Sequence, residues 1–238
     1  MDKDRVAAVI PGAGSGERLG LSESKLFLLL GDKPVLVHTL EKLQQSPIVD
    51  EVVLVVRRTD LSRARALVTD YRLAKVSDII EGGDRRQDSV YLGLRTLLGR
   101  GVQYVFIHDA VRPFFDAEQI PELLEATKVH GAAILAIRPK DTIKLSDGVP
   151  FVQQTLERSK LWAVQTPQCF EIELLMKAYR RAMKENFVGT DDASLVERLG
   201  VKVRIVEGSH DNIKITTKED LELAELILRR QPSGRVKS

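Results

Sequence analysis

Runs of consecutive apolar residues alternate with segments of helical periodicity along the first half of the chain. The apolar runs predict β-strands at residues 6–10, 51–56, 76–80, 104–107 and 132–137. Apolar positions three and four residues apart predict helices at residues 34–45, 61–71, 90–98 and 117–130. Strands that are apolar on both faces are typical of a mainly parallel sheet that helices cover on both sides. The pattern therefore predicts an α/β fold with a Rossmann-like sheet.

The alternation of strands and helices stops between residues 139 and 158. Two β-prone segments, 142–145 and 151–156, flank the sequence Ser146-Asp147-Gly148, which is typical of a hairpin turn. An isolated hairpin is only marginally stable in water. We therefore expect a protruding β-arm that rests on another subunit.

The second half of the chain then returns to the α/β pattern. It predicts strands at residues 161–165, 201–206 and 213–215, and helices at residues 172–184, 192–199 and 219–230. Thr217 with Asp220 three residues later predicts a capped start for the last helix. We expect one domain over residues 1–230, with the arm at about 139–158, and a disordered polar tail at 231–238.

The composition is that of a soluble globular protein, with 43% hydrophobic and 29% charged residues among 238. The net charge of +2 gives no reason to expect nucleic acid or a membrane as a partner. The single cysteine, Cys169, excludes an intramolecular disulfide and a cysteine-rich zinc site. It fits a reducing, cytoplasmic location, as does an N-terminal stretch that lacks the long apolar segment of a signal peptide.

The first strand ends in a glycine-rich stretch, Pro11-Gly12-Ala13-Gly14-Ser15-Gly16-Glu17-Arg18, and Lys25 follows. Glycines at alternate positions allow close approach of the backbone to a ligand, and successive N–H groups in such a loop form an anion site. Arg18 and Lys25 add two positive charges. The stretch therefore predicts a polyphosphate site, with a tight turn that binds nothing as the alternative.

Two familiar phosphate motifs do not fit this stretch. A Walker A loop requires a Gly-Lys pair, which the stretch does not contain. A dinucleotide fingerprint requires a third glycine where Glu17 stands, and an acidic residue where the second strand instead ends in Arg57-Arg58. A nucleoside-triphosphate loop that uses arginine and lysine remains.

Two further polar clusters also follow predicted strands directly. Gly82 to Ser89 come after the third strand, and His108-Asp109 come after the fourth. Ligands of parallel sheets bind outside the carboxyl ends of the strands, so we expect both clusters to join the glycine loop in one site. Within the first cluster, Gly83, Asp84 and Ser89 would suit a base or ribose, or would simply begin the next helix.

Asp109 is the best candidate for a metal ligand. A single carboxylate beside a phosphate site suits Mg²⁺, although it would equally cap the next turn. Asp191 and Asp192 are read first as a helix cap, with a second metal ligand as the alternative. Lys214 alternates away from its β-branched neighbours, toward solvent or toward the cleft. No serine, histidine and acidic residue share the spacing of a nucleophile with its base.

Taken together, these blocks resemble the 2-C-methyl-D-erythritol 4-phosphate cytidylyltransferase family, over about residues 5–228. The resemblance rests on eight blocks in order: the glycine loop with Lys25; Gly-Gly-Asp-Arg-Arg-Gln-Asp-Ser-Val from Gly82; His-Asp-Ala-Val-Arg-Pro from His108; Asp141-Thr142; Arg158 with Leu161-Trp162; Gln165-Thr166-Pro167-Gln168; Thr190-Asp191-Asp192-Ala193; and Asp211-Asn212-Ile213-Lys214. The family implies a nucleotide-diphospho-sugar transferase type of fold. It also implies transfer of a cytidylyl group from CTP to a polyol phosphate with release of pyrophosphate, in non-mevalonate isoprenoid biosynthesis.

The resemblance also implies roles for the matching positions. Catalysis would fall to Arg18, Lys25 and Lys214, and nucleotide binding to Ala13, Gly14, Gly16, Gly83, Asp84 and Ser89. Asp109 would hold Mg²⁺ or another divalent cation. Substrate binding would involve Arg112 and Thr166, and also Thr142 and Arg158 on the arm, which in this family reaches the partner subunit of a homodimer.

The chain departs from the family pattern at three positions. Ser24 and Leu26 flank the lysine where proline and glutamine are usual, and Gly12 stands where alanine is common. Two other functions therefore stay open, a ribitol-5-phosphate cytidylyltransferase and a non-catalytic nucleotide-binding protein. The Gly-Gly-Asp block and Arg158-Ser-Lys-Leu-Trp favour the erythritol substrate over ribitol.

Overall fold

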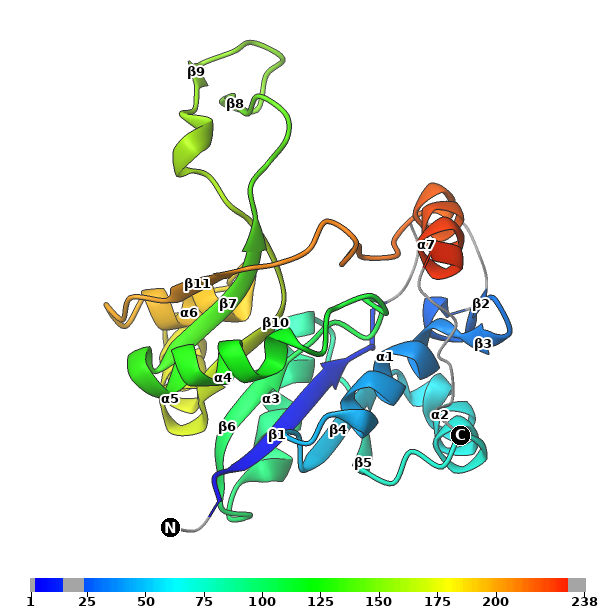
Figure 1. Cartoon of the computed structure of the whole chain (residues 1–238). Helices are drawn as coiled ribbons and strands as arrows, with labels where there is room; N and C mark the ends of the chain where they lie inside the picture. Colours follow the sequence, from blue (N-terminus) through cyan, green and yellow to red (C-terminus); the bar gives the residue numbers. More distant parts are fainter. Residues whose placement is uncertain (1–2, 15–23, 231–238) are drawn as a thin grey trace.

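A mixed sheet of seven strands forms the centre of the molecule (Figure 1). The computed structural model describes residues 3–14 and 24–230. In spatial order the strands are β11 (Arg204–Glu207), β7 (Ala132–Ile137), β10 (Ala163–Glu171), β6 (Val102–Ile107), β1 (Arg5–Pro11), β4 (Glu51–Val56) and β5 (Val76–Glu81). The disordered tail expected at 231–238 lies outside the described residues.

Most strand pairs are parallel, as the uninterrupted apolar runs predicted. β6, β1, β4 and β5 run in one direction, and β7 pairs in parallel with β11. β10 lies between β6 and β7 and is antiparallel to both. The carboxyl ends of β1, β5 and β6 therefore meet at one edge of the sheet, which is where the three polar clusters follow their strands.

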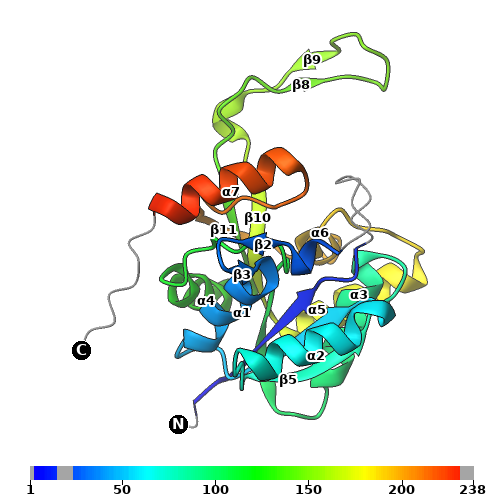
Figure 2. The same cartoon turned by 90° about the vertical axis from the view of Figure 1, so that its right-hand side faces the viewer.

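Helices cover both faces of the sheet (Figure 2). One face packs against α1 (Val35–Gln45), α2 (Leu61–Asp70) and α4 (Gln119–His130), and the other packs against α3 (Arg86–Leu97), α5 (Ile172–Lys184) and α6 (Asp192–Glu197). Alternate residues of one strand divide between the two cores. In β1, for example, Ala8 and Ile10 join the first core while Ala7 and Val9 join the second. This double burial is the reason that β1 is apolar at every position from Val6 to Ile10.

A third, smaller core lies beside the sheet. The last helix, α7 (Lys218–Arg230), buries Ala224 and Ile227 there against residues near the short hairpin of β2 (Leu29–Leu30) and β3 (Lys33–Pro34). The predicted cap of this helix is present, because the Asp220 carboxylate accepts from the Thr217 N–H at 2.9 Å while the Thr217 hydroxyl accepts from the Asp220 N–H at 3.2 Å. Among the described residues, no helix is both long and apolar enough to cross a bilayer.

The arm projects away from the sheet as a thin hairpin (Figures 1 and 2). Its strands, β8 (Lys144–Leu145) and β9 (Gln154–Thr155), are antiparallel, and a short 3-10 helix (Arg158–Lys160) follows them. Both paired segments are shorter than predicted. Several large apolar side chains of the arm are exposed, and Phe151 at 76% is the most exposed of them.

Two local predictions were wrong. Residues 213–215 form no strand, although their side chains alternate as a strand would: Ile215 is buried and Lys214 is half-exposed. Within the described residues, the segment makes a single backbone hydrogen bond to a neighbouring segment, from the Ile215 N–H to the Val111 carbonyl at 3.0 Å. The strand predicted at 161–165 instead spans Ala163–Glu171, because it continues through polar residues that face the loops around the site.

Candidate active site

A cavity of about 470 Å³ lies at the sheet edge where the carboxyl ends of β1, β5 and β6 meet. Residues from all three predicted clusters line it, together with the segment around Lys214. Among the residues with expected roles, the lining includes Ala13, Gly14, Lys25, Gly83, Asp84, Ser89, Asp109 and Lys214. The predicted convergence of these clusters on one site is confirmed. Arg18 and Gly16 lie outside the described residues.

The glycine loop begins at Gly12, whose N–H donates to the Val55 carbonyl at 2.7 Å. Neither Gly12 nor Gly14 has a positive φ, so neither is required for a left-handed backbone. Packing instead favours glycine at position 12, because a Cβ there would lie 3.1 Å from Leu26 and 3.3 Å from Ala110. A Cβ at Gly14 would meet nothing within 4 Å.

This packing connects two of the departures from the family pattern. Leu26 is 2% exposed, and its Cδ atoms occupy the space into which an alanine at position 12 would project. The glycine and the leucine are therefore complementary in this chain. At Ser24, φ is −66°, which is close to the value that proline imposes. The backbone there would therefore also accept proline, the residue that is usual in the family. In the described part of the chain, its buried hydroxyl has no hydrogen-bond partner.

Lys25 is held at the cavity wall by the segment that precedes α7. Its Nζ donates to the Thr216 carbonyl at 2.9 Å. Thr216 is fixed in turn by Asp220, whose carboxylate accepts from the Thr216 N–H at 2.8 Å and from the Thr216 hydroxyl at 2.7 Å. The capped start of the last helix thus fixes the carbonyl to which the ammonium group of Lys25 donates.

Ser89 organises the loop that follows β5. Its hydroxyl accepts from the Gly83 N–H at 3.2 Å and donates to the Arg85 carbonyl at 3.1 Å. A Cβ at Gly82 would lie 2.6 Å from both the Cβ of Ala13 and the hydroxyl of Ser89, so glycine there permits the two loops to touch. Asp88 completes the start of α3 by accepting from the Arg85 N–H at 3.2 Å.

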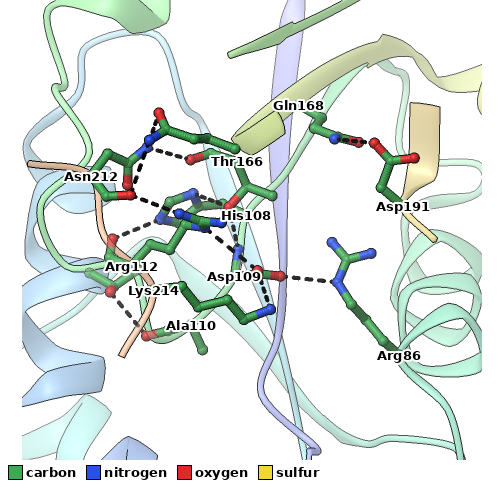
Figure 3. Close-up of polar contacts among 12 residues, drawn as sticks. Arg86, His108, Asp109, Ala110, Arg112, Thr166, Gln168, Asp191, Asn212 and Lys214 are labelled. Atoms are coloured by element: carbon green, nitrogen blue, oxygen red, sulfur yellow. Dashed lines mark hydrogen bonds and ion pairs between the residues drawn. The ribbon is translucent and has the colours of Figure 1, made fainter. Parts of the chain in front are cut away.

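Asp109 is the centre of a cluster of cations (Figure 3). Its Oδ1 accepts from Arg86 Nε at 3.0 Å, its Oδ2 lies 2.8 Å from Lys214 Nζ, and Arg112 Nε lies 3.7 Å from Oδ2. Burial alone would raise the pKa of the Asp109 carboxyl, but the charges of Arg86 and Lys214 outweigh it, so the pKa lies well below its usual range. The carboxylate is therefore ionised throughout the physiological range.

Arg112 and Thr166 lie behind the cavity, and neither lines it. Arg112 Nη1 donates to the Asn212 carbonyl at 2.7 Å. The Thr166 hydroxyl accepts from the Asp109 N–H at 3.0 Å and lies 3.1 Å from His108 Nδ1. Both residues therefore contact the chain segments that carry Asp109 and Lys214.

His108 is a buried structural residue, as expected. Its Nε2 lies 3.1 Å from the Arg112 carbonyl, which can only accept, so Nε2 carries the proton and Nδ1 accepts from Thr166. Burial lowers the pKa of the imidazole from 6.5 to about 3.

This shift predicts a loss of stability in mild acid. Between pH 6.5 and 5 the unfolded chain binds a proton at His108 that the folded chain does not, so the free energy of unfolding falls as the pH falls, by up to about 1.4 kcal/mol per pH unit. Urea unfolding at several pH values, in buffer free of divalent cations, measures this slope. The variant His108→Gln is expected to have a shallower slope, and equal slopes in the two proteins would contradict the assignment.

Thr142 and Arg158 are exposed on the arm and do not line the cavity of their own chain. Arg158 Nη1 donates to the Lys140 carbonyl at 2.7 Å, which connects the two sides of the arm near its base. The cavity gathers most of the residues expected to bind nucleotide, but not the two arm residues expected to bind substrate.

Arg86 lines the cavity and contacts Asp109, yet the sequence analysis gave it no role. Its position in the Gly82 block, directly after the third strand, was the available signal. Asp191 is the cap of α6, since its carboxylate accepts from the Ser194 N–H at 3.0 Å. The Asp192 carboxylate accepts from Arg86 Nη1 at 2.8 Å and does not line the large cavity. Across the described residues, no group of three or more His, Cys, Asp or Glu side chains could hold a metal ion without other ligands.

Comparisons with known proteins give a consistent result. The family model for 2-C-methyl-D-erythritol 4-phosphate cytidylyltransferase matches residues 6–230. The chain is 47% identical to the enzyme of that name from Geobacillus kaustophilus, over 93% of this chain and 96% of the relative. It is 43% identical to that from Syntrophus aciditrophicus, over 98% and 100%.

Solved structures agree with the relatives. The 4-diphosphocytidyl-2C-methyl-D-erythritol synthase of Anaerococcus prevotii superposes with a TM-score of 0.84 at 32% identity, covering 96% of this chain and 97% of that one. The 2-C-methyl-D-erythritol 4-phosphate cytidylyltransferase of Francisella tularensis gives 0.79 at 33% identity, covering 94% and 100%. On fold, site and sequence alike, the chain belongs to the 2-C-methyl-D-erythritol 4-phosphate cytidylyltransferase family.

Proposed function

We propose that this chain, acting as one nucleotidyltransferase domain over residues 1–230, transfers the cytidylyl group of CTP to 2-C-methyl-D-erythritol 4-phosphate. A phosphate oxygen of the acceptor forms a bond to the α-phosphorus of CTP, and the bond from that phosphorus to the bridging oxygen of the β-phosphate breaks. The products are 4-diphosphocytidyl-2-C-methyl-D-erythritol and pyrophosphate. The observation that carries the proposal is the cavity, in which lysine and arginine side chains surround the ionised carboxylate of Asp109.

Cations at fixed positions account for catalysis in which no protein side chain acts as a nucleophile. The acceptor is a phosphate monoester that is already ionised near pH 7, so no general base is needed. Negative charge develops on the transferring group, and charges held in advance stabilise it. Lys25 and Lys214 line the cavity for this role, and Arg18 would join them.

The loops after β1 and β5 supply the nucleotide site. Ala13, Gly14, Gly83 and Asp84 line the cavity and would offer backbone groups and one carboxylate to the base, ribose and phosphates of CTP. Gly16, outside the described residues, would join them. Ser89 contributes by holding the Gly83 N–H in place. Thr166 and Arg112 support the acceptor side indirectly, through Asp109 and Asn212.

Asp109 would hold Mg²⁺ or another divalent cation. Mg²⁺ takes one or two protein carboxylates and completes its octahedron with phosphate oxygens and water. The donor set fits this ion, because the ionised carboxylate of Asp109 lines the cavity beside the loops that would hold the phosphates. When bound, the ion would neutralise charge on the phosphates of CTP.

The arm would make the enzyme a homodimer, with Thr142 and Arg158 serving the acceptor site of the partner. Exposed apolar side chains on the arm support this, since such groups are usually covered by a partner. We expect the double variant Phe151→Ser, Val152→Ser to sediment as a monomer and to lose most of its turnover, while the native chain sediments as a dimer. Met183→Ser removes another exposed apolar side chain, from α5, and should stay dimeric. A native chain that is monomeric at micromolar concentration would contradict the dimer.

Pyrophosphate release tests the function directly. The purified protein is incubated with CTP and Mg²⁺, and either 2-C-methyl-D-erythritol 4-phosphate or ribitol 5-phosphate is added as the acceptor. We expect pyrophosphate release only when the acceptor is the erythritol phosphate. Release with ribitol 5-phosphate would assign the other polyol, and release with neither would indicate a nucleotide-binding protein without this activity.

A further inference from the structure

Arg86 is shared between two carboxylates. Its Nε donates to Asp109 Oδ1 at 3.0 Å, and its Nη1 donates to Asp192 Oδ2 at 2.8 Å (Figure 3 shows the first contact). The two acids differ in their surroundings. Asp109 lines the large cavity, whereas Asp192 does not, and the side chain of Asp192 is 1% exposed.

Asp192 is fixed in its position. The Tyr179 hydroxyl donates to its Oδ1 at 2.5 Å, and the ring of Tyr179, itself buried, stacks on Tyr91 with centroids 6.0 Å apart. Gln168 of β10 fixes the two residues that flank Asp192 in the sequence. Its side-chain amide donates to the Asp191 carboxylate at 2.8 Å, and its side-chain oxygen accepts from the Ala193 N–H at 3.1 Å. The carboxylate of Asp192 therefore cannot follow a ligand into the cavity.

Arg86 has space on both sides. Its side chain is 31% exposed, and it lines the large cavity as well as a second cavity of about 30 Å³ that Tyr179 and Asp192 also line. The guanidinium is charged at every pH at which the protein is folded. A displacement away from Asp109 would leave it beside Asp192, with its charge still balanced.

Both oxygens of Asp109 are occupied in this arrangement. Arg86 holds Oδ1 and Lys214 holds Oδ2. Each oxygen still has a second acceptor position, but a divalent cation bound there lies beside the guanidinium and the ammonium group and repels both. A side-chain cation that is displaced from a buried carboxylate needs another counter-ion. For Arg86, that counter-ion is already in contact.

We propose that Asp192 is a positioning residue that acts through Arg86: as a second, buried counter-ion it draws the guanidinium off the Asp109 carboxylate, so that this carboxylate can bind a divalent cation beside the nucleotide. The inference rests on the metal-binding role proposed above for Asp109. If Asp192 is neutral, Arg86 pairs with Asp109 alone and competes with the cation.

The test is the Mg²⁺ dependence of the variant Asp192→Asn. At saturating CTP, we expect the Mg²⁺ concentration for half-maximal turnover to rise about 10- to 100-fold, with kcat at high Mg²⁺ close to native, because the effect is competition at one carboxylate. A second readout needs no turnover: with CTP present and the acceptor absent, the thermal midpoint is followed as MgCl₂ is added. The half-effective concentration should rise by the same factor.

Two further variants separate this role from a structural one. Asp191→Asn alters the cap of the same helix without touching Arg86, and it should leave the Mg²⁺ dependence unchanged. In an Arg86→Gln background, Asp192→Asn should cause no further shift, since its partner is gone. Arg86→Gln alone removes the competitor and should lower the half-effective Mg²⁺ concentration, which tests the inference even if Asp192→Asn does not fold.

Three results would overturn the inference. One is an Asp192→Asn variant that loses the same fraction of turnover at every Mg²⁺ concentration. The others are a shift that persists without Arg86, and a rise in the half-effective concentration for Arg86→Gln. If the native enzyme itself shows no Mg²⁺ dependence, the metal role of Asp109 fails together with the inference. If the native enzyme depends on Mg²⁺ and Asp192→Asn shows the same half-effective concentration, the inference fails but the metal role of Asp109 stands.

Discussion

Replacing Lys25 with alanine is expected to lower kcat by about 100-fold or more, which is the scale of losing one group that stabilises the transition state. That factor corresponds to about 2.7 kcal/mol in the activation free energy. The ammonium group lines the cavity and is held in place by the Thr216 carbonyl at 2.9 Å, so its position is set before substrate binds. A charge fixed in this way needs no reorganisation as negative charge grows on the transferring group.

The measurement is steady-state pyrophosphate release at saturating CTP, acceptor and Mg²⁺. A loss mainly in kcat would place the lysine at the transition state, whereas a rise in KM for CTP with unchanged kcat would make it a binding residue only. Lys177→Ala removes an exposed lysine from α5 and is expected to retain native turnover. A Lys25→Ala enzyme with near-native kcat would refute the catalytic role.

Replacing Asp109 with asparagine is expected to lower Mg²⁺-dependent turnover by about 10²- to 10³-fold. The amide keeps the size of the side chain but removes its charge. Two effects then add: the proposed metal ligand is lost, and Arg86, Lys214 and Arg112 lose the carboxylate that they share. Burial by itself favours the neutral carboxyl, so the ionised form depends on these cations.

The cation cluster offers a second readout for this variant. Without the carboxylate it should bind anions more strongly, so sulfate should raise the thermal midpoint of Asp109→Asn more than that of the native protein. Asp70→Asn, an exposed change at the end of α2, should alter neither turnover nor the sulfate response. Native turnover in Asp109→Asn, or an unchanged response to sulfate, would contradict the role of Asp109 as the centre of the cluster.

The sequence predicted most elements well because burial leaves a clear pattern. The strand Glu51–Val56 and the helix Ile172–Lys184 have the predicted bounds. Both are long, and apolar residues mark their buried faces. One failure concerns residues 213–215, which alternate like a strand. Alternation records only which side chains are buried and says nothing about a neighbouring strand to pair with.

The strand β10 shows the opposite failure. Its polar residues made it look like a loop after residue 165, yet they serve the site from within the sheet. Gln165 donates to the Ser209 carbonyl at 2.8 Å, Thr166 contacts His108, and Gln168 reaches Asp191 at 2.8 Å. A polar side chain in a buried strand needs partners, and here those partners lie 44 or more residues away for Gln165 and 23 for Gln168.

The sequence by itself determined the fold class and the kinds of chemical group at the site. Glycines, lysines and one aspartate follow strands whose carboxyl ends must share an edge, and this local order is enough to predict a phosphate cavity. The tertiary structure alone decided how those groups are coupled. Arg86 and Asp192 are 106 residues apart, and nothing in the local pattern of either residue indicates the other. Their pairing follows from the packing of α3 against the layer of α5 and α6, because a contact between distant segments depends on the whole fold.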